Sequence, residues 1–227
     1  MTERKNDLII SEEQHQVLLG IMLGDGHLEL AKNKKSARLK IEQSIEKRVY
    51  IEHLYQLFKS WSVSKIRLAT HEKGINLTFS TLYSPDLLKY HQMFYKGTTR
   101  VIPQGIENEF TARSFAYLFM DDGGIKSKES KGVFINTYSL AQDEQESFCK
   151  FLDRIFNLKA KVVQDSKVYK SKRRFYPRIY ISGKSFDTLV ALLESYILPF
   201  FLYKIPPRRS EKSRFRSVDE ITQLPKR

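Results

Sequence analysis

The stretch Phe115–Gly124, FAYLFMDDGG, joins an apolar run directly to two carboxylates and two glycines. The apolar run is too short to cross a membrane, so we expect it to form a buried helix. Charge at the end of a buried helix is costly unless something pairs with it. The C-terminal end of a helix also carries partial negative charge already. A cation near Asp121 and Asp122 would relieve both costs.

The composition indicates a basic chain that binds a polyanion. Its 227 residues carry a formal net charge of +13, and 41% of them are hydrophobic, which is ample for a packed core. Nucleic acid is the leading partner, and an anionic membrane surface is the second. The single cysteine, Cys149, excludes an internal disulfide and a cysteine-based zinc site. The charged N-terminus lacks the apolar run of a signal peptide, so no targeting signal is expected.

A second stretch, Leu18–Gly26, repeats the form of the first, because its apolar run also ends in an acidic turn. Hydrophobic periodicity predicts that each apolar helix is followed by two strands, a helix, two strands and a helix. In the first half we expect these elements at about residues 12–23, 27–31, 37–44, 46–61, 63–71, 75–80 and 85–95. In the second half we expect them at about residues 112–122, 125–128, 133–138, 140–156, 159–168, 175–182 and 185–196.

Two similar halves in one chain imply a pseudo-two-fold axis. A cation shortly before an Ile-Pro pair closes each half, Arg100 in the first and Lys204 in the second. If the axis runs between the two apolar helices, their ends bring Asp25 and Asp122 together. The expected halves are residues 1–103 and 104–206, followed by a loosely held basic tail, residues 207–227.

The repeated stretches carry a family resemblance. Leu18–Gly26, LLGIMLGDG, and Phe115–Gly123, FAYLFMDDG, each resemble the LAGLIDADG motif. The chain is similar to the single-chain, two-motif LAGLIDADG homing endonucleases over nearly all of its length except the tail. The resemblance implies an α+β fold with two αββαββα halves, the motif helices at the dyad, and two antiparallel sheets that form a saddle over double-stranded DNA. It also implies a monomer that makes metal-dependent double-strand breaks at a long recognition site.

The resemblance implies a metal site at the end of each motif helix. Metal ions held by carboxylates can activate water and stabilise a leaving oxygen, and Mg²⁺ prefers oxygen ligands. A nearby cationic side chain would stabilise developing negative charge. The last motif aspartates, Asp25 and Asp122, would bind Mg²⁺ (or Mn²⁺), the preceding Gly24 and Asp121 would offer backbone carbonyls, and Arg100 and Lys204 would be the basic catalytic residues.

The predicted strands alternate between apolar and polar residues, which gives each sheet a polar face. Such a face suits β-ribbon reading of the major groove, with phosphate contacts around it. The candidate DNA-binding residues are Arg38, Lys40, Lys65 and Arg67 in the first half and Lys159, Lys161, Arg174, Arg178 and Tyr180 in the second.

Several positions keep more than one interpretation. Tyr117 and Asp121 stand where the first motif has glycines, so the helix interface cannot be symmetric. Gln43 and Asn136 end strands close behind the acidic turns and could position water, although packing or edge hydrogen bonds are the simpler interpretation. Asp25 alone would suit a simple turn, and the repeat favours metal ligation instead.

Two other functions use the same scaffold. An intron RNA-binding maturase would have host intron RNA as its partner, and both motif aspartates favour a nuclease over it. A transcription regulator derived from the family is disfavoured, because no helix-turn-helix pattern is evident. Relatives are commonly encoded in organelle introns, so the resemblance implies a chloroplast or mitochondrial setting.

Overall fold

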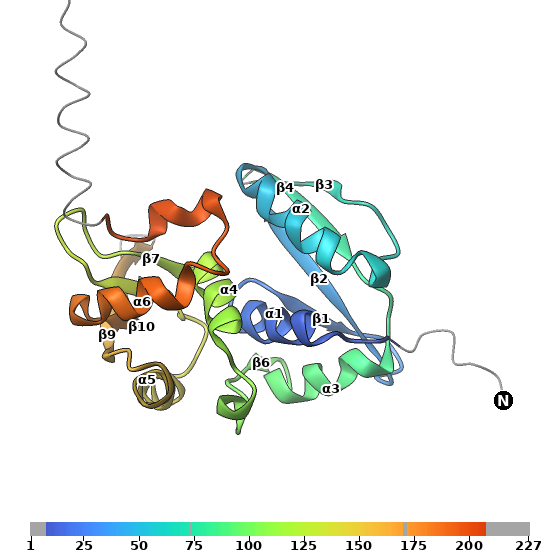
Figure 1. Cartoon of the computed structure of the whole chain (residues 1–227). Helices are drawn as coiled ribbons and strands as arrows, with labels where there is room; N and C mark the ends of the chain where they lie inside the picture. Colours follow the sequence, from blue (N-terminus) through green and yellow to red (C-terminus); the bar gives the residue numbers. More distant parts are fainter. Residues whose placement is uncertain (1–7, 73, 170–171, 208–227) are drawn as a thin grey trace, which may run out of the picture.

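The computed structural model describes residues 8–72, 74–169 and 172–207. The predicted basic tail therefore lies outside the described residues, apart from its first residue. Figure 1 shows two halves on either side of a central helix pair, α1 (Glu12–Leu23) and α4 (Ala112–Asp122). Two four-stranded sheets, one from each half, confirm the expected α+β class.

The first half follows the predicted order of elements. Helix α1 begins with a capping box, in which the Ser11 hydroxyl accepts a hydrogen bond from the Gln14 amide at 3.2 Å. The sheet has the strand order β1-β2-β4-β3, and every neighbouring pair is antiparallel. The elements after α1 are β1 (His27–Leu30), β2 (Ala37–Ser44), α2 (Arg48–Leu57), β3 (Arg67–His71), β4 (Gly74–Ser80) and α3 (Pro85–Phe94).

The second half repeats this order, so the predicted doubling of the αββαββα unit is confirmed. Its strand order, β7-β8-β10-β9, corresponds strand by strand to that of the first half. A short hairpin not predicted from the sequence, β5 (Tyr95–Lys96) with β6 (Thr99–Arg100), follows α3. The elements after α4 are β7 (Gly123–Ile125), β8 (Val133–Ile135), α5 (Gln142–Phe156), β9 (Ala160–Tyr169), β10 (Lys172–Ile181) and α6 (Phe186–Leu193).

Strand β2 shows how each sheet acquires one covered and one open face. Burial alternates along all eight of its residues. Leu39 and Ile41 are fully buried on the side of the helices. Arg38, Lys40 and Glu42 point to the opposite face, where they are only partly covered. The predicted alternation of this strand is therefore confirmed.

Two predicted strand positions are wrong. Strand β3 begins at Arg67, so Lys65 precedes it. Strand β9 begins one residue after Lys159, which instead forms an ion pair of 2.7 Å with Asp153. Both lysines lie in connections, where strand alternation no longer fixes the face of a side chain. Leu68 lies opposite the buried Leu77 on the covered face, but it is 64% exposed because β3 is the edge strand of its sheet.

The contact between α1 and α4 explains why the two motifs differ in sequence. A Cβ atom at Gly20 would lie 2.9 Å from the Tyr117 Cβ and would collide with the Ser114 backbone oxygen. A Cβ atom at Gly24 would lie 2.6 Å from the Asp121 Cβ. Gly20 in α1 and Gly24 at its C-cap therefore each make room for a larger residue of α4, and the two helices stay close-packed although their interface is asymmetric.

The motif helices form the centre of the core. Helix α1 is buried from Val17 to Leu23, and α4 is buried from Ser114 to Asp121. Cys149 is a free, buried thiol within this hydrophobic core. Over the described ranges, the structure has no helix with the length and apolarity needed to span a bilayer.

Candidate active site and nucleic-acid interface

The two motif helices end beside one cleft. This cleft has a volume of about 650 Å³, and its lining includes Asp25, Asp122 and Arg100. Asn136 and Tyr138 line it from the second half. The axis expected between the helices thus brings the two motif aspartates to a common cavity, to which both halves contribute.

Asp25 is held from three directions. Its Oδ2 atom accepts a hydrogen bond from Gln43 Nε2 at 3.0 Å and lies 3.4 Å from Lys47 Nζ. Its backbone amide donates to Asp121 Oδ2 at 3.0 Å. Gln43 is 4% exposed, so a buried amide and a lysine together fix the orientation of a partly exposed carboxylate.

Lys47 was not predicted as a site residue. It ends the short 3-10 helix η1 (Ile45–Lys47), between β2 and α2. The sequence could have indicated Lys47 only through its position, four residues after Gln43 and just beyond the strand that contains this glutamine. The chain has 39 lysine and arginine residues, so a single lysine after a strand is not distinctive.

Asp122 occupies a more buried setting than Asp25. Burial, and then the negative charge of Asp25, raises the pKa of the Asp122 carboxyl to about 7. Lys204, Lys47 and Arg100 oppose this rise through their positive charge. The Asp122 backbone oxygen accepts a hydrogen bond from the Asn136 backbone amide at 3.0 Å, which joins the end of α4 to the residue that follows strand β8.

Asp121 lies behind the cleft rather than in its lining. Its side chain is 7% exposed, and burial, followed by the charge of Asp25, raises its pKa well above the usual range. One carboxylate oxygen accepts from the Asp25 amide. Asp121 of the second motif therefore supports the turn that carries Asp25 of the first.

Arg100 and Lys204 occupy corresponding places beneath the two helix ends. Arg100 donates to the Gly24 carbonyl and, at 2.6 Å, to the Gly26 carbonyl. Lys204 donates to the Met120 and Asp121 carbonyls at 2.6 and 3.0 Å. Burial, and then the charge of Lys47, lowers the pKa of Lys204 to about 8. Each cation thus offsets the partial negative charge of a helix C-terminus.

The donor set fits a hard divalent cation that keeps water and phosphate oxygens among its ligands. Two carboxylates reach the cleft from adjacent helix ends, and a bound cation would offset the burial and the Asp25 charge that raise the pKa of Asp122. The Gly24 and Asp121 carbonyls already accept hydrogen bonds, but each oxygen has a second lone pair. The described residues include no group of three or more His, Cys, Asp and Glu side chains that could hold a metal without such outside ligands.

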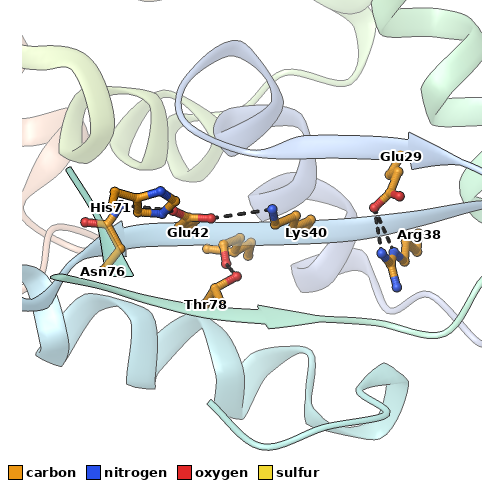
Figure 2. Close-up of polar contacts among 8 residues, drawn as sticks. Glu29, Arg38, Lys40, Glu42, His71, Asn76 and Thr78 are labelled. Carbon is orange, nitrogen blue, oxygen red and sulfur yellow. Dashed lines mark hydrogen bonds and ion pairs between the residues drawn. The ribbon is translucent and has the colours of Figure 1, made fainter. Parts of the chain in front are cut away.

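The open face of the first sheet carries the predicted basic residues of its strands. Figure 2 shows the two hydrogen bonds that Arg38 donates to Glu29 Oε2, from Nε at 2.9 Å and from Nη2 at 2.7 Å. The Arg38 guanidinium also lies 4.7 Å from the Tyr83 ring centroid. Lys40 lies two residues further along the same face of β2. Arg67 pairs with Thr78 of β4, which in turn pairs with Glu42 of β2, so these residues share that face.

In the second sheet, four of the five predicted residues lie on one face of the β9–β10 ribbon. Lys161 is the cross-strand partner of Tyr180, and Arg174 and Arg178 lie on the same face as Tyr180 by alternation along β10. The Arg178 guanidinium lies 3.6 Å from the Phe134 ring centroid, and its Nη2 lies 3.4 Å from Asp165. Lys159, which precedes β9, is the exception.

Comparison with known proteins gives relatives that match most of the chain. It is 29% identical over 212 residues to the probable intron-encoded endonuclease 1 of Wickerhamomyces canadensis, covering 89% of this chain and 87% of that protein. It is 26% identical over 205 residues to the cytochrome b mRNA maturase bI2 of Saccharomyces cerevisiae, covering 83% of this chain and 46% of the maturase.

The fold and the family are shown by two further matches. The solved structure of the homing endonuclease I-WcaI bound to its DNA recognition sequence has a TM-score of 0.75 and 27% identity, covering 87% of this chain and 88% of that one. The LAGLIDADG DNA endonuclease family matches this chain over residues 15–189, which include both motifs. The chain therefore belongs to the LAGLIDADG DNA endonuclease family.

Proposed function

We propose that this protein is a site-specific homing endonuclease that, as a monomer, cuts both strands of double-stranded DNA at a long recognition site with Mg²⁺ or Mn²⁺. One observation carries the proposal: Asp25 and Asp122, at the ends of two adjacent motif helices, line a single cleft together with Arg100. Family membership and the likeness to a DNA-bound homing endonuclease support it. The residues 1–103 and 104–206 would each supply one metal ligand set and one DNA-reading sheet.

The residues of the cleft have separate tasks in this proposal. Divalent metals held by Asp25 in the first half and by Asp122 in the second would supply an activated water and stabilise the leaving oxygen. The Gly24 and Asp121 carbonyls would complete the protein ligands. Arg100 would neutralise phosphate charge in the cleft. Three further residues would support these groups. Gln43 and Lys47 would orient the Asp25 carboxylate, and Lys204 would hold the backbone carbonyls at the end of α4.

DNA would lie across the open faces of both sheets. The net charge of +13 supplies the general attraction to phosphate. Side chains on the strands would enter the major groove, and those in the connections would contact the backbone. The proposed base-reading residues are Arg38, Lys40, Arg67, Lys161, Arg174, Arg178 and Tyr180, and the proposed phosphate contacts are Lys65 and Lys159.

The test is cleavage of a plasmid that carries a site selected with the wild-type protein. We expect linear product with Mg²⁺ and none with a chelator. Asp25→Asn and Asp122→Asn should each reduce double-strand cutting at least about a hundredfold, because each removes a metal-binding charge. Asp187→Asn, a surface carboxylate on α6, is the matched control and should cut normally. Full activity of either motif variant would exclude the proposed site.

A maturase function is the second candidate, and one observation favours it. Two of the similar proteins are cytochrome b mRNA maturases of yeasts, at 26% and 24% identity. In that case the partner would be host intron RNA, and the gene would be expected in a chloroplast or mitochondrial intron. Tight binding of the host intron RNA without metal-dependent DNA cutting would select this function over the nuclease.

A further inference from the structure

Glu42 stands on the open face of the first sheet, where a negative charge is unexpected. The proposed ligand is a polyanion, and a carboxylate directed at phosphate would repel it. Glu42 nevertheless lies among Lys40, His71 and Asn76 over strands β2, β3 and β4 (Figure 2). A carboxylate in the middle of this face is therefore better placed to meet base edges than the DNA backbone.

The contacts of Glu42 fix its orientation. Its Oε1 atom accepts from Asn76 Nδ2 at 2.9 Å and lies 2.5 Å from His71 Nε2. The Asn76 hydrogen bond is the main reason that its pKa lies below the usual range, so the side chain is an anion at neutral pH. The other oxygen, Oε2, has a longer contact of 3.5 Å to Lys40 Nζ. One oxygen thus anchors the side chain, and the other remains available as an acceptor.

Glu29, the other carboxylate in Figure 2, has a different task. Its Oε2 atom accepts two hydrogen bonds from the Arg38 guanidinium, at 2.7 and 2.9 Å. Both bonds come from one guanidinium, which also lies over the Tyr83 ring, and the Tyr83 side chain hydrogen-bonds Glu29 as well. We therefore assign Glu29 to the support of Arg38. Of these two carboxylates, only Glu42 is assigned to the reading of DNA.

Lys40 and Glu42 together present a donor and an acceptor side by side. They are two residues apart on β2, so they point to the same face. In the major groove a C·G pair shows the cytosine N4 amino donor beside the guanine O6 and N7 acceptors, and carboxylates and lysines are suited to these groups respectively. An A·T pair also shows an amino donor beside an acceptor, thymine O4, but the thymine methyl group lies beyond that acceptor, where guanine offers N7 as a second acceptor for the lysine.

We propose that Glu42 and Lys40 read one C·G base pair in the half-site bound by the first sheet, Glu42 accepting from cytosine N4 and Lys40 donating to the guanine. This inference rests on the proposed function for the presence of duplex DNA on this face. It requires only sequence-specific binding, so it can be tested separately from cleavage.

The experiment measures equilibrium binding to the selected site in a chelator, so that no DNA is cut. All three replacements are made at each base pair of both half-sites. We expect Glu42→Gln to lower the preference for cytosine at one position about tenfold or more, and to shift it towards adenine, whose N6 and N7 suit an amide. Lys40→Met should weaken discrimination at the same base pair.

Glu52→Gln is the matched control, because it removes the same charge from helix α2 on the covered side of the sheet. Glu52→Gln should leave the base preference at every position of the site unchanged. A Glu42→Gln profile identical to that of the control would overturn the inference while leaving the nuclease proposal intact. If the wild-type protein binds duplex DNA but does not cut it, the nuclease proposal falls and the binding profile still decides this inference. Absence of sequence-specific duplex binding by the wild-type protein would overturn both.

Discussion

Asp122 makes the stability of the metal-free protein depend on pH. Its pKa is about 7 in the folded state, against about 3.9 in an unfolded chain. Because the folded state binds the proton more tightly, the contribution of Asp122 to the free energy of unfolding is greatest below about pH 4. It falls as the pH rises towards 7. A divalent cation that binds the ionised carboxylate should reverse this loss. We therefore expect Mg²⁺ to raise the Tm more at about pH 8 than at about pH 5.5.

Thermal unfolding with Mg²⁺ and with a chelator at the two pH values measures this difference. Asp122→Asn should reduce the pH dependence of the metal effect, because the amide does not titrate. Part of the pH dependence should remain in this variant, because the pKa of Asp121 is also raised. Asp187→Asn should leave the effect unchanged. An equal Mg²⁺ shift at both pH values would contradict the assignment of Asp122 as a metal ligand.

At the level of the helices, the close packing of α1 against α4 determines which substitutions the protein tolerates. The backbone oxygen of Ser114 faces Gly20 and cannot rotate away, unlike a side chain. We expect Gly20→Ala to lower the free energy of unfolding by about 1–3 kcal/mol, as overpacking does in other close-packed cores. Chemical denaturation of the full chain measures this change.

Gly124 supplies the control, since a Cβ atom there would meet nothing within 4 Å and its backbone is not in the left-handed region. Gly124→Ala should change the free energy of unfolding by less than about 0.5 kcal/mol. If both variants were equally stable, α1 and α4 would not be packed as closely as the structure shows.

The elements themselves were largely predictable, because each depends on a local signal. The Ser11 capping box and the alternation along β2 specify their elements without knowledge of the rest of the chain. Edge strands and connections were not predictable in this way. Leu68 alternates like a core residue but lies at a sheet edge, and Lys65 and Lys159 lie just outside their strands. Their surroundings depend on how far a neighbouring strand extends, which periodicity does not encode.

The candidate site was predictable where a repeated pattern carries it: the two motifs indicate Asp25 and Asp122, and the repeated Ile-Pro pair indicates Arg100. The contacts of Gln43 and Lys47 with Asp25 depend on how the end of β2 meets the turn after α1, and that is a tertiary arrangement. The bond from the Asp121 side chain to the Asp25 amide likewise joins the two halves, 96 positions apart in the chain.

At the scale of the whole molecule, the two halves agree in topology and differ at the cleft. The strand orders β1-β2-β4-β3 and β7-β8-β10-β9 correspond, and a cation holds each helix end. Asp25, however, is oriented by two polar side chains, whereas the hydrogen bond from Asn136 to Asp122 joins backbone atoms. A pseudo-two-fold fold therefore contains two unequal carboxylate sites. Since each site would serve one DNA strand, a change confined to the first half should affect the strands unequally.

Lys47→Met tests this asymmetry, because it removes the positive charge beside the Asp25 carboxylate and keeps an apolar side chain of similar length. We expect cleavage of one strand to slow by about 10- to 100-fold, the range found when a side chain that orients a metal ligand is removed, while the other strand is cut at nearly the wild-type rate. Nicked product should then accumulate. Single-turnover cleavage of a duplex labelled on each strand in turn measures both rates. Lys59→Met, an exposed lysine of the 3-10 helix η2 (Lys59–Trp61), is the control. Equal slowing of both strands would show that the two carboxylates act as one shared site, and the independence of the halves would be refuted.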